Sequence, residues 1–220
     1  MKRRKFLQNA SLSTLGMVAT ASVIGCKNST ENTTVIASAN TAIQPIVIAT
    51  WLVPNATAKA WEVLQNGGTA LDAVEQGCMI EEADLKNVSV GKGGLPDRDG
   101  NVTLDACIMD KDGNYGAVMC VQNITHVISL ARKVMEKTPH VILAGKGAEE
   151  FGYEQGFKKE NLLTESSKKA WKKWKETSQY KPIINIENHD TIGMLAIDSF
   201  GDISGACTTS GLSYKMAGRV

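Results

Sequence analysis

The chain has 220 residues, of which 43% are hydrophobic and 21% are charged. This composition is typical of a globular protein and excludes a disordered or coiled-coil chain, and the length is sufficient for one sizeable domain. The 24 lysines and arginines nearly balance the 23 aspartates and glutamates. A net charge so close to zero gives no long-range field that would attract nucleic acid or an anionic membrane, so neither is expected as a partner.

The first 26 residues resemble an export signal. A basic start at Lys2–Lys5 precedes a mildly apolar run from Leu12 to Ile24, which is too short to span a bilayer well. Residues 23–26 resemble a lipobox in which Cys26 would be acylated, and Arg3-Arg4-x-Phe6-Leu7 resembles a twin-arginine signal. The alternative is an ordinary cleaved signal in which Cys26 has no role. We therefore expect an exported, periplasmic protein, anchored as a lipoprotein if Cys26 is acylated.

Residues 27–42 are rich in Ser, Thr, Asn and Ala and are expected to form a flexible tether before the folded domain. The cysteines beyond Cys26 are Cys78, Cys107, Cys120 and Cys207. An oxidising compartment could pair this even number, but none has the C-x-x-C spacing of a metal or redox motif. We favour four separate buried thiols that pack as small apolar residues, and no metal or cofactor is expected.

Apolar periodicity and turn residues predict the elements of the fold. Strands are expected at 45–50, 102–109, 116–121, 140–143, 191–198 and 203–209, and helices at 56–65, 69–82, 127–137 and from about residue 147. The Asp112-Gly113-Asn114 turn would join the second and third strands as a hairpin. Because hairpins and helices fall in separate blocks, the order indicates α+β layers instead of repeated parallel βαβ units.

Residues 157–188 are rich in lysine and contain Trp171 and Trp174. Basic residues interleaved with aromatics can bind nucleic acid, but acidic residues dilute this patch. We favour a solvated helix with one tryptophan anchored beneath it. Neither a P-loop nor a G-x-S-x-G motif occurs, and His126 and His140 are expected to be structural.

The pair Asp190-Thr191 lies where a polar segment meets an apolar strand. A threonine hydroxyl is a weak nucleophile unless a base lies within hydrogen-bond reach. A threonine at a new N-terminus carries such a base, because its free α-amino group has a pKa of roughly 7.7–8.0. Cleavage after Asp190 would therefore create a nucleophile and its base in one residue, with the Asp190 carboxylate as the base for the cleavage itself. On spacing alone, the alternative is a turn residue followed by an ordinary strand start.

Several separate blocks from residue 43 to the end resemble the glycosylasparaginases, which are N-terminal nucleophile hydrolases. The blocks are Pro45-Ile46-Val47, Thr50-Trp51, Gly67–Val74, Ser89–Gly94, Pro96–Ala106, Asn188–Met194, Gly205–Gly211 and Tyr214–Val220. The resemblance implies a four-layer αββα fold, with an α chain at 43–190 and a β chain that starts at Thr191. It also implies an αβ heterodimer after self-cleavage, in a family whose αβ units usually pair.

The resemblance further implies hydrolysis of the amide between N-acetylglucosamine and the side chain of a free asparagine. Thr191 would be the nucleophile and Thr209 the residue that supports self-cleavage. Trp51 would line the substrate pocket, although core packing is its alternative, and Arg219 would clamp the substrate carboxylate with its planar fork. Isoaspartyl peptidases and plant-type asparaginases share the nucleophile, so the reaction type is better defined than the substrate.

The sequence ends one residue after Arg219. In the family a glycine and a substrate-binding aspartate follow, and later a threonine-glycine pair forms the oxyanion hole. From this difference we expect a C-terminally truncated precursor, for which loss of an oxyanion donor costs roughly 100- to 1,000-fold in rate. A second hypothesis of another class is a non-catalytic exported binding module that keeps the fold.

Overall fold

The computed structural model describes residues 43–178 and 191–220. Within them, six strands form one sheet in the order β1-β5-β6-β2-β3-β4. The strands are β1 (Ile46–Ala49), β2 (Leu104–Met109), β3 (Tyr115–Val121), β4 (Ile142–Ala144), β5 (Ile192–Ile197) and β6 (Ile203–Thr209). All neighbours are antiparallel except β3 and β4. The predicted α+β class is therefore confirmed.

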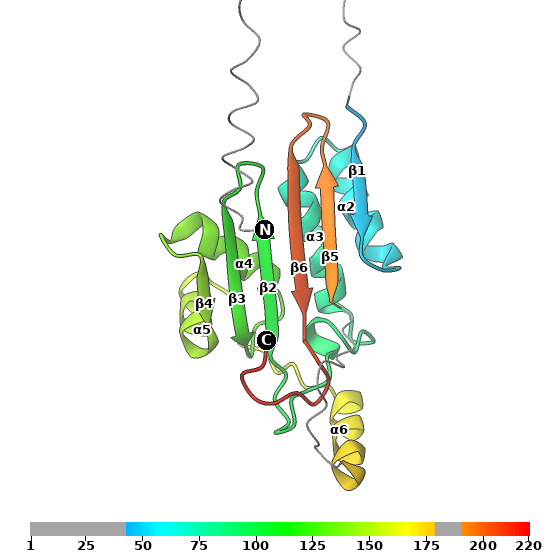
Figure 1. The fold of residues 1–220 in the computed structure, drawn as a ribbon, viewed down its shortest axis with the longest axis vertical. Coiled ribbons are helices and arrows are strands. Elements are labelled where there is room, and N and C mark those ends of the chain that lie inside the picture. The colour runs from blue at the N-terminus through cyan, green and yellow to red at the C-terminus, as the bar shows by residue number, and fades with distance from the viewer. Residues whose placement is uncertain (1–42, 179–190) are drawn as a thin grey trace, which may run out of the picture. The chain divides into compact units, whose positions relative to one another are not determined.

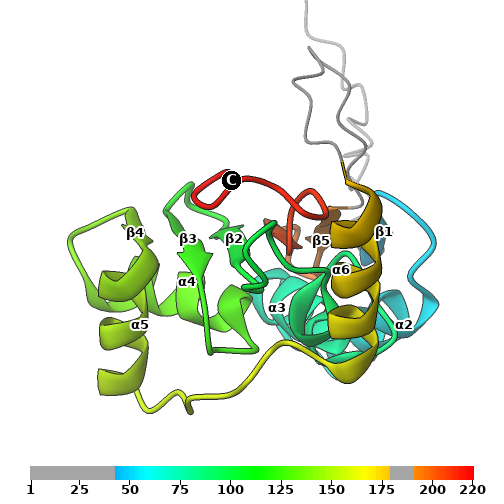
Figure 2. The same cartoon turned by 90° about the horizontal axis from the view of Figure 1, so that it is seen from below.

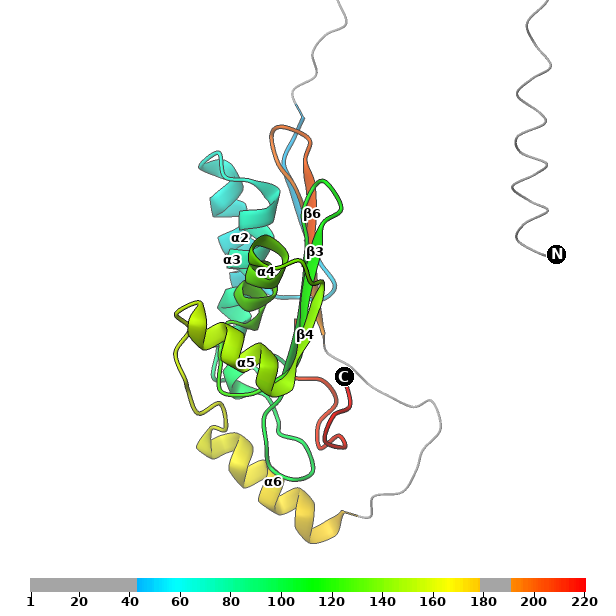
Figure 3. The same cartoon turned by 90° about the vertical axis from the view of Figure 1, so that its left-hand side faces the viewer.

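Helices cover one face of the sheet (Figure 3). The helices on this face are α2 (Pro54–Gln65), α3 (Ala70–Ala83), α4 (Val127–Lys137) and α5 (Gly145–Glu154). The described residues also form a short 3-10 turn, η1 (Gly91–Gly93), and a helix beyond the end of the sheet, α6 (Glu165–Thr177; Figure 3). Helix α2 begins two residues earlier than predicted, because Pro54 occupies the first turn, where a missing N–H breaks no helical hydrogen bond. Helix α3 begins as predicted, since the Thr69 hydroxyl accepts a hydrogen bond from the Asp72 amide.

The core lies between the sheet and helices α2, α3 and α4. Strand residues that alternate toward the helices are fully buried, among them Leu104, Ile108, Ile192 and Met194. Helix α4 lies so close to β3 that a Cβ atom at Gly116 would come 2.2 Å from the Ala131 carbonyl oxygen. Glycine is therefore required there by close packing.

The opposite face of the sheet, seen in Figure 1, is uncovered within the described residues. Its exposed side chains are largely apolar: Ile46, Ile48, Met109, Tyr115, Leu195 and Ile203. A sheet face of this kind is typical of one that packs on a second sheet. The described residues thus supply one helix layer and one sheet layer of the αββα sandwich. None of their helices has the length and hydropathy needed to span a membrane.

Helix α6 lies at the end of the sheet where β6 ends (Figures 1 and 2). Trp171 Nε1 donates to the Arg98 carbonyl at 3.1 Å, and the Trp174 ring stacks on Tyr214 with centroids 4.6 Å apart. Two tryptophans therefore anchor this lysine-rich helix, where the sequence pattern indicated one.

The prediction of four separate buried thiols was wrong. Only Cys78 is fully buried, whereas Cys107 is exposed and Cys120 and Cys207 are partly exposed. Cys107 and Cys207 also stand directly opposite each other on β2 and β6. The error arose because the cysteines were judged by spacing along the chain, while strand register brings together residues that are far apart.

Candidate active site

Three segments that carry predicted site residues meet at one end of the sheet. Strands β1 and β6 end there and β5 begins there (Figure 1). Trp51 follows β1, Thr191 immediately precedes β5, and Thr209 is the last residue of β6. Asp190, predicted as the residue before the cleaved bond, lies outside the described residues.

Two side chains from the end of β1 hold the backbone of Thr191. Its carbonyl oxygen accepts hydrogen bonds from Thr50 Oγ1 at 3.1 Å and from Trp51 Nε1 at 3.2 Å. Thr50 Oγ1 also accepts from the Gly193 amide at 3.0 Å, and the Thr50 amide donates to the Gly193 carbonyl at 3.0 Å. The segment that follows the proposed cleavage point is thereby fixed to β1.

Strand register places Thr209 beside Thr191. Ile192 pairs with Thr208, and both of these side chains are buried toward the helices. Because side chains alternate along a strand, Thr191 and Thr209 both face the uncovered side of the sheet. Thr209 Oγ1 donates to the Ser89 carbonyl at 3.3 Å and accepts from the Gly211 amide at 2.8 Å, so its hydroxyl is held in place.

A surface cavity of about 480 Å³ adjoins these residues. It is lined by Trp51, Glu81, Asp84, Lys86, Asn87, Val88 and Ser89. The Trp51 residue is 37% exposed, so core packing, the alternative for this tryptophan, is wrong. Its ring therefore adjoins a space large enough for a small molecule, while its N–H contacts the predicted nucleophile.

A buried carboxylate lies beneath this end of β6. Glu82 Oε1 accepts from Thr208 Oγ1 at 2.7 Å and from the Ile128 amide at 2.9 Å, and Glu82 Oε2 lies 3.3 Å from His126 Nδ1. Burial raises the pKa of Glu82, although the hydrogen bonds from His126 and Thr208 oppose this. The hydrogen bond with Glu82 raises the pKa of His126 above its usual 6.5. His126 thus has a buried carboxyl group as its hydrogen-bond partner, and its structural role stays a prediction.

The segment after β6, which contains Arg219, is fixed by a second buried charge pair. Lys215 Nζ lies 3.2 Å from Asp105 Oδ2, and both side chains are almost fully buried. The Lys215 carbonyl accepts from the Arg98 amide at 2.9 Å, and the Arg219 amide donates to the Met216 carbonyl at 3.1 Å. The segment returns beneath the end of the sheet (Figure 1), and the role of Arg219 as a carboxylate clamp stays a prediction.

Sequence reasoning missed three residues at this site: Ser89, Glu82 and Lys215. The signal for Glu82 was present, because it continues the buried stripe Ala70, Val74, Cys78 at helical spacing. A carboxylate on the apolar stripe of a helix must find partners inside the protein. No comparable local pattern marks Ser89 or Lys215. Among the residues that the structure describes, no group of three His, Cys, Asp or Glu side chains could hold a metal ion.

The chain is similar in sequence to known proteins. A sequence profile for the family described as Asparaginase matches residues 32–220. The chain is 63% identical over 178 residues to the N(4)-(beta-N-acetylglucosaminyl)-L-asparaginase of Elizabethkingia miricola, covering 80% of this chain and 52% of that protein. It is 38% identical over 207 residues to the enzyme of the same name from Rattus norvegicus, covering 80% of this chain and 60% of that protein.

A relative with another name is also similar. The isoaspartyl peptidase/L-asparaginase of Xenopus laevis is 41% identical over 173 residues, covering 76% of this chain and 55% of that protein. The chain thus spans between about half and three-fifths of the length of these relatives. The matched region contains every predicted site residue from Trp51 to Arg219. The chain therefore belongs to the asparaginase family.

Proposed function

We propose that the chain is the nucleophile-bearing part of an amidohydrolase that cuts itself before Thr191 and then hydrolyses glycoasparagines. The observation that carries this proposal is the position of Thr191. Its carbonyl is held by Thr50 and Trp51, and its side chain faces the same side of the sheet as that of Thr209. The relative from Elizabethkingia miricola, named for this activity, supports the choice of substrate.

In the activation step, the Thr191 hydroxyl oxygen attacks the carbonyl carbon of residue 190 and the C–N bond breaks, which converts the amide to an ester. Water then hydrolyses the ester, leaving a carboxylate on residue 190 and a free amine on Thr191. The backbone hydrogen bonds to Thr50 and Trp51 would hold the Thr191 side of the bond while residue 190 moves. The product is an αβ heterodimer of an α chain that ends at residue 190 and a β chain that begins at Thr191, and we also propose that these units pair as in the family.

In turnover, Thr191 Oγ would attack the substrate amide carbon while the new α-amino group accepts its proton and passes it to the leaving amine. A β-aspartyl ester forms and water hydrolyses it to free aspartate. Arg219 would bind the substrate carboxylate, and the exposed Trp51 ring would provide an apolar surface for the sugar at the adjacent cavity. These roles require no metal or organic cofactor.

Intact mass tests the first step. The chain, expressed from its complete reading frame, should yield two fragments whose masses correspond to cleavage between residues 190 and 191. The Thr191→Ala variant should remain whole. Thr191→Ser keeps a hydroxyl and is the matched variant that should still cleave. If a folded parent chain stays whole, the nucleophile hypothesis fails and the non-catalytic binding module takes its place.

The second candidate is an isoaspartyl peptidase/L-asparaginase, favoured by the relative of that name in Xenopus laevis. The two candidates share the nucleophile and differ in the leaving group. Assays of the cleaved protein with a glycoasparagine and with a β-aspartyl dipeptide distinguish them. Faster hydrolysis of the dipeptide would replace the glycoasparagine proposal.

We also propose export through residues 1–26, which lie outside the described residues. Fractionation of cells that express the chain would test this, with Cys26→Ser as the variant that cannot be acylated. A periplasmic parent protein in the membrane fraction that becomes free with Cys26→Ser would support a lipid anchor. Cytoplasmic retention of the parent would contradict export.

A further inference from the structure

A buried carboxylate joins helix α3 to the strand that ends at Thr209. Glu82 lies in the last turn of α3, and its side chain is fully buried between the helices and the sheet. Its Oε1 accepts hydrogen bonds from the Thr208 hydroxyl and the Ile128 amide, and its Oε2 lies within hydrogen-bond distance of His126 Nδ1. Both carboxylate oxygens therefore have partners, and the group is held between the start of α4 and the end of β6.

The loop that follows α3 binds the same end of β6. The Ser89 carbonyl accepts hydrogen bonds from the Ser210 amide at 2.8 Å and from Thr209 Oγ1 at 3.3 Å. Asn87 braces this loop, because its Oδ1 accepts from the Ser89 amide at 3.0 Å and its Nδ2 donates to Glu81 Oε2 at 2.8 Å. One short stretch of chain thus contacts three consecutive residues at the end of β6.

Close packing fixes the backbone of this part of α3. A Cβ atom at Gly91, which has a φ of +64°, would overlap the Glu82 carbonyl oxygen, so the η1 turn lies directly against the end of the helix. A Cβ atom at Gly77 would lie 2.6 Å from Met194 Sδ on β5. The carboxylate therefore extends from a helix that cannot shift freely relative to the sheet.

Strand register carries the effect of this contact to the candidate site. Thr208 faces the helices and pairs with Ile192 of β5. Thr191 and Thr209 are the next residues along each strand and face the other side of the sheet. A displacement of Thr208 relative to β5 therefore changes the separation of Thr191 and Thr209, although the Glu82 hydrogen bonds involve neither residue.

We infer that Glu82 is a positioning residue for the cleavage before Thr191 and that it acts through the Thr208 hydroxyl. A carboxylate suits this role, because a hydrogen bond to an ionised acceptor is roughly twice as strong as one between neutral groups. It holds the end of β6 from the helix side, so that Thr209 stays beside Thr191 while the peptide bond breaks. This inference rests on the proposed function and adds to it a residue that touches no reacting atom.

The charge of Glu82 depends on the groups that face it. Burial raises the pKa of Glu82, although hydrogen bonding opposes this change. The titratable groups beside the carboxyl are His126 at the start of α4 and Cys78 one turn earlier on α3, while Glu75 and Glu160 act on His126 in turn. Protonation in acid converts Glu82 to a neutral acceptor that resembles an amide. The advantage that its charge gives to cleavage should therefore be lost as pH falls.

The test measures the rate of cleavage in chains made from the complete reading frame by pulsed cell-free synthesis and weighed intact at intervals. Thr208→Val keeps the shape of the side chain but removes the hydroxyl, so it should slow cleavage about tenfold at neutral pH. Thr208→Ser keeps the hydroxyl and should cleave at the parent rate. These two variants test the contact even if a change at Glu82 prevents folding.

Glu82→Gln tests the charge itself. It should slow cleavage about threefold at neutral pH, and the ratio of the parent rate to the variant rate should approach one in acid. Glu82→Gln combined with Thr208→Val should cleave no more slowly than Thr208→Val alone, because both changes act on one contact. A merely structural role for Glu82 would leave the ratio of the two rates constant across this pH range, and that result would overturn the inference.

Asp72→Asn is the matched control on the same helix. Asp72 lies in the first turn of α3, where it contacts Arg132, so its replacement should lower the thermal midpoint and leave the cleavage rate unchanged. Equal cleavage rates in the parent and in folded Thr208→Val would overturn the inference and leave the proposed function intact. A folded parent that never cleaves would overturn both.

Discussion

Glu82 Oε1 lies 2.7 Å from Thr208 Oγ1, although 126 residues separate the two in the chain. Thr208 precedes Thr209 and pairs with Ile192, which follows Thr191. The carboxylate of α3 is therefore hydrogen-bonded to β6 one residue before Thr209, and the residue paired with Thr208 is the neighbour of Thr191. His126 is its only ionisable hydrogen-bond partner among the described residues.

Replacement of Glu82 by glutamine should lower the pKa of His126. The hydrogen bond and charge of Glu82 raise this pKa, and an amide oxygen keeps the acceptor for Thr208 while removing the charge. NMR titration of the imidazole in the parent and in Glu82→Gln would measure the shift. An unchanged His126 pKa would show that Glu82 does not control its charge.

Stability should fall as pH rises through the neutral range. The folded-state pKa of His126 is raised, so its contribution is complete below the unfolded value of 6.5 and is lost as pH rises through the higher folded value. The pKa of Glu82 is raised by burial, so ionisation of this group above its usual 4.5 acts in the same direction. Glu160 and Glu75 also raise the His126 pKa. Thermal melts of the parent and His126→Gln should differ most at acidic pH and converge above neutrality. Parallel curves across this range would contradict the linkage.

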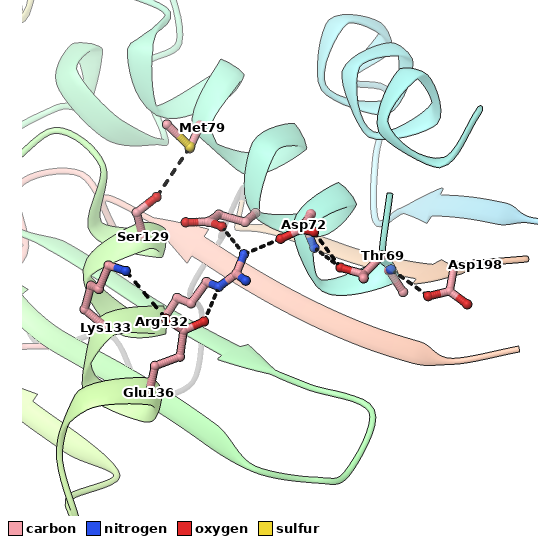
Figure 4. A network of polar contacts seen from close by, with 10 residues as sticks. Thr69, Asp72, Met79, Ser129, Arg132, Lys133, Glu136 and Asp198 are labelled. Atoms are coloured by element: carbon pink, nitrogen blue, oxygen red, sulfur yellow. Dashed lines mark hydrogen bonds and ion pairs between the residues drawn. The ribbon is translucent and has the colours of Figure 1, made fainter. Parts of the chain in front are cut away.

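Arg132 of α4 contacts three carboxylates, two on α3 and one on its own helix, and Figure 4 shows its guanidinium between Asp72 of α3 and Glu136 of α4. The third partner is Glu75. Arg132→Lys should lower the free energy of unfolding by about 1 kcal/mol, because an ammonium cannot contact all three groups and partial exposure screens the pairs. Urea unfolding would measure this change.

The dependence of the same ion pairs on acidic pH provides the control for the Arg132→Lys prediction. Burial alone would raise the pKa of Asp72, but hydrogen bonds from Arg132 and Thr69 lower it below 3.8. The stabilisation is therefore present above that value and is lost as pH falls through the lowered one. The difference between the parent and Arg132→Lys should shrink in strong acid, and a difference that stays constant would exclude the ion pairs as its cause.

Local patterns predicted the elements because their causes are local. The Thr69 cap, the apolar stripe of α4 and the Asp112-Gly113 turn each lie within a few residues of the structure that they determine. The order of strands β5 and β6 between β1 and β2 has no such signal, because pairing across a sheet depends on contacts between distant segments.

The candidate site likewise has residues that the sequence predicted and contacts that only the structure shows. The resemblance alone predicted the roles of Thr191, Thr209, Trp51 and Arg219, since no residue pattern distinguishes a nucleophile from a strand start. Contacts such as Trp51 with Thr191 join residues 140 positions apart, and only the folded sheet specifies them. The role of Asp190 and the domain boundaries at 26 and 42 stay predictions.

Thr50→Val should slow the proposed cleavage before Thr191 by about five- to tenfold. Valine keeps the shape of threonine but removes the hydroxyl that bonds Thr191 and Gly193, a loss of about 1–1.5 kcal/mol. The rate is followed by intact mass after transfer to cleavage conditions. Thr57→Val removes a helical side-chain bond to Val53 and should leave the rate unchanged. Equal cleavage rates in Thr50→Val and the parent would show that Thr50 does not position the peptide bond before Thr191.

Lys215→Met should destabilise the fold by about 3–5 kcal/mol, because it leaves the buried Asp105 carboxylate without its cation. Asp105→Asn combined with Lys215→Met removes both charges and keeps an acceptor for the Cys120 amide, so it should cost less than the sum of the single changes. Urea unfolding of the parent, the two single variants and the double variant gives the coupling energy between Asp105 and Lys215. Lys111→Met breaks the exposed pair with Asp112 and should leave the unfolding midpoint unchanged. Additive effects of the two buried substitutions would show that Asp105 and Lys215 do not stabilise each other.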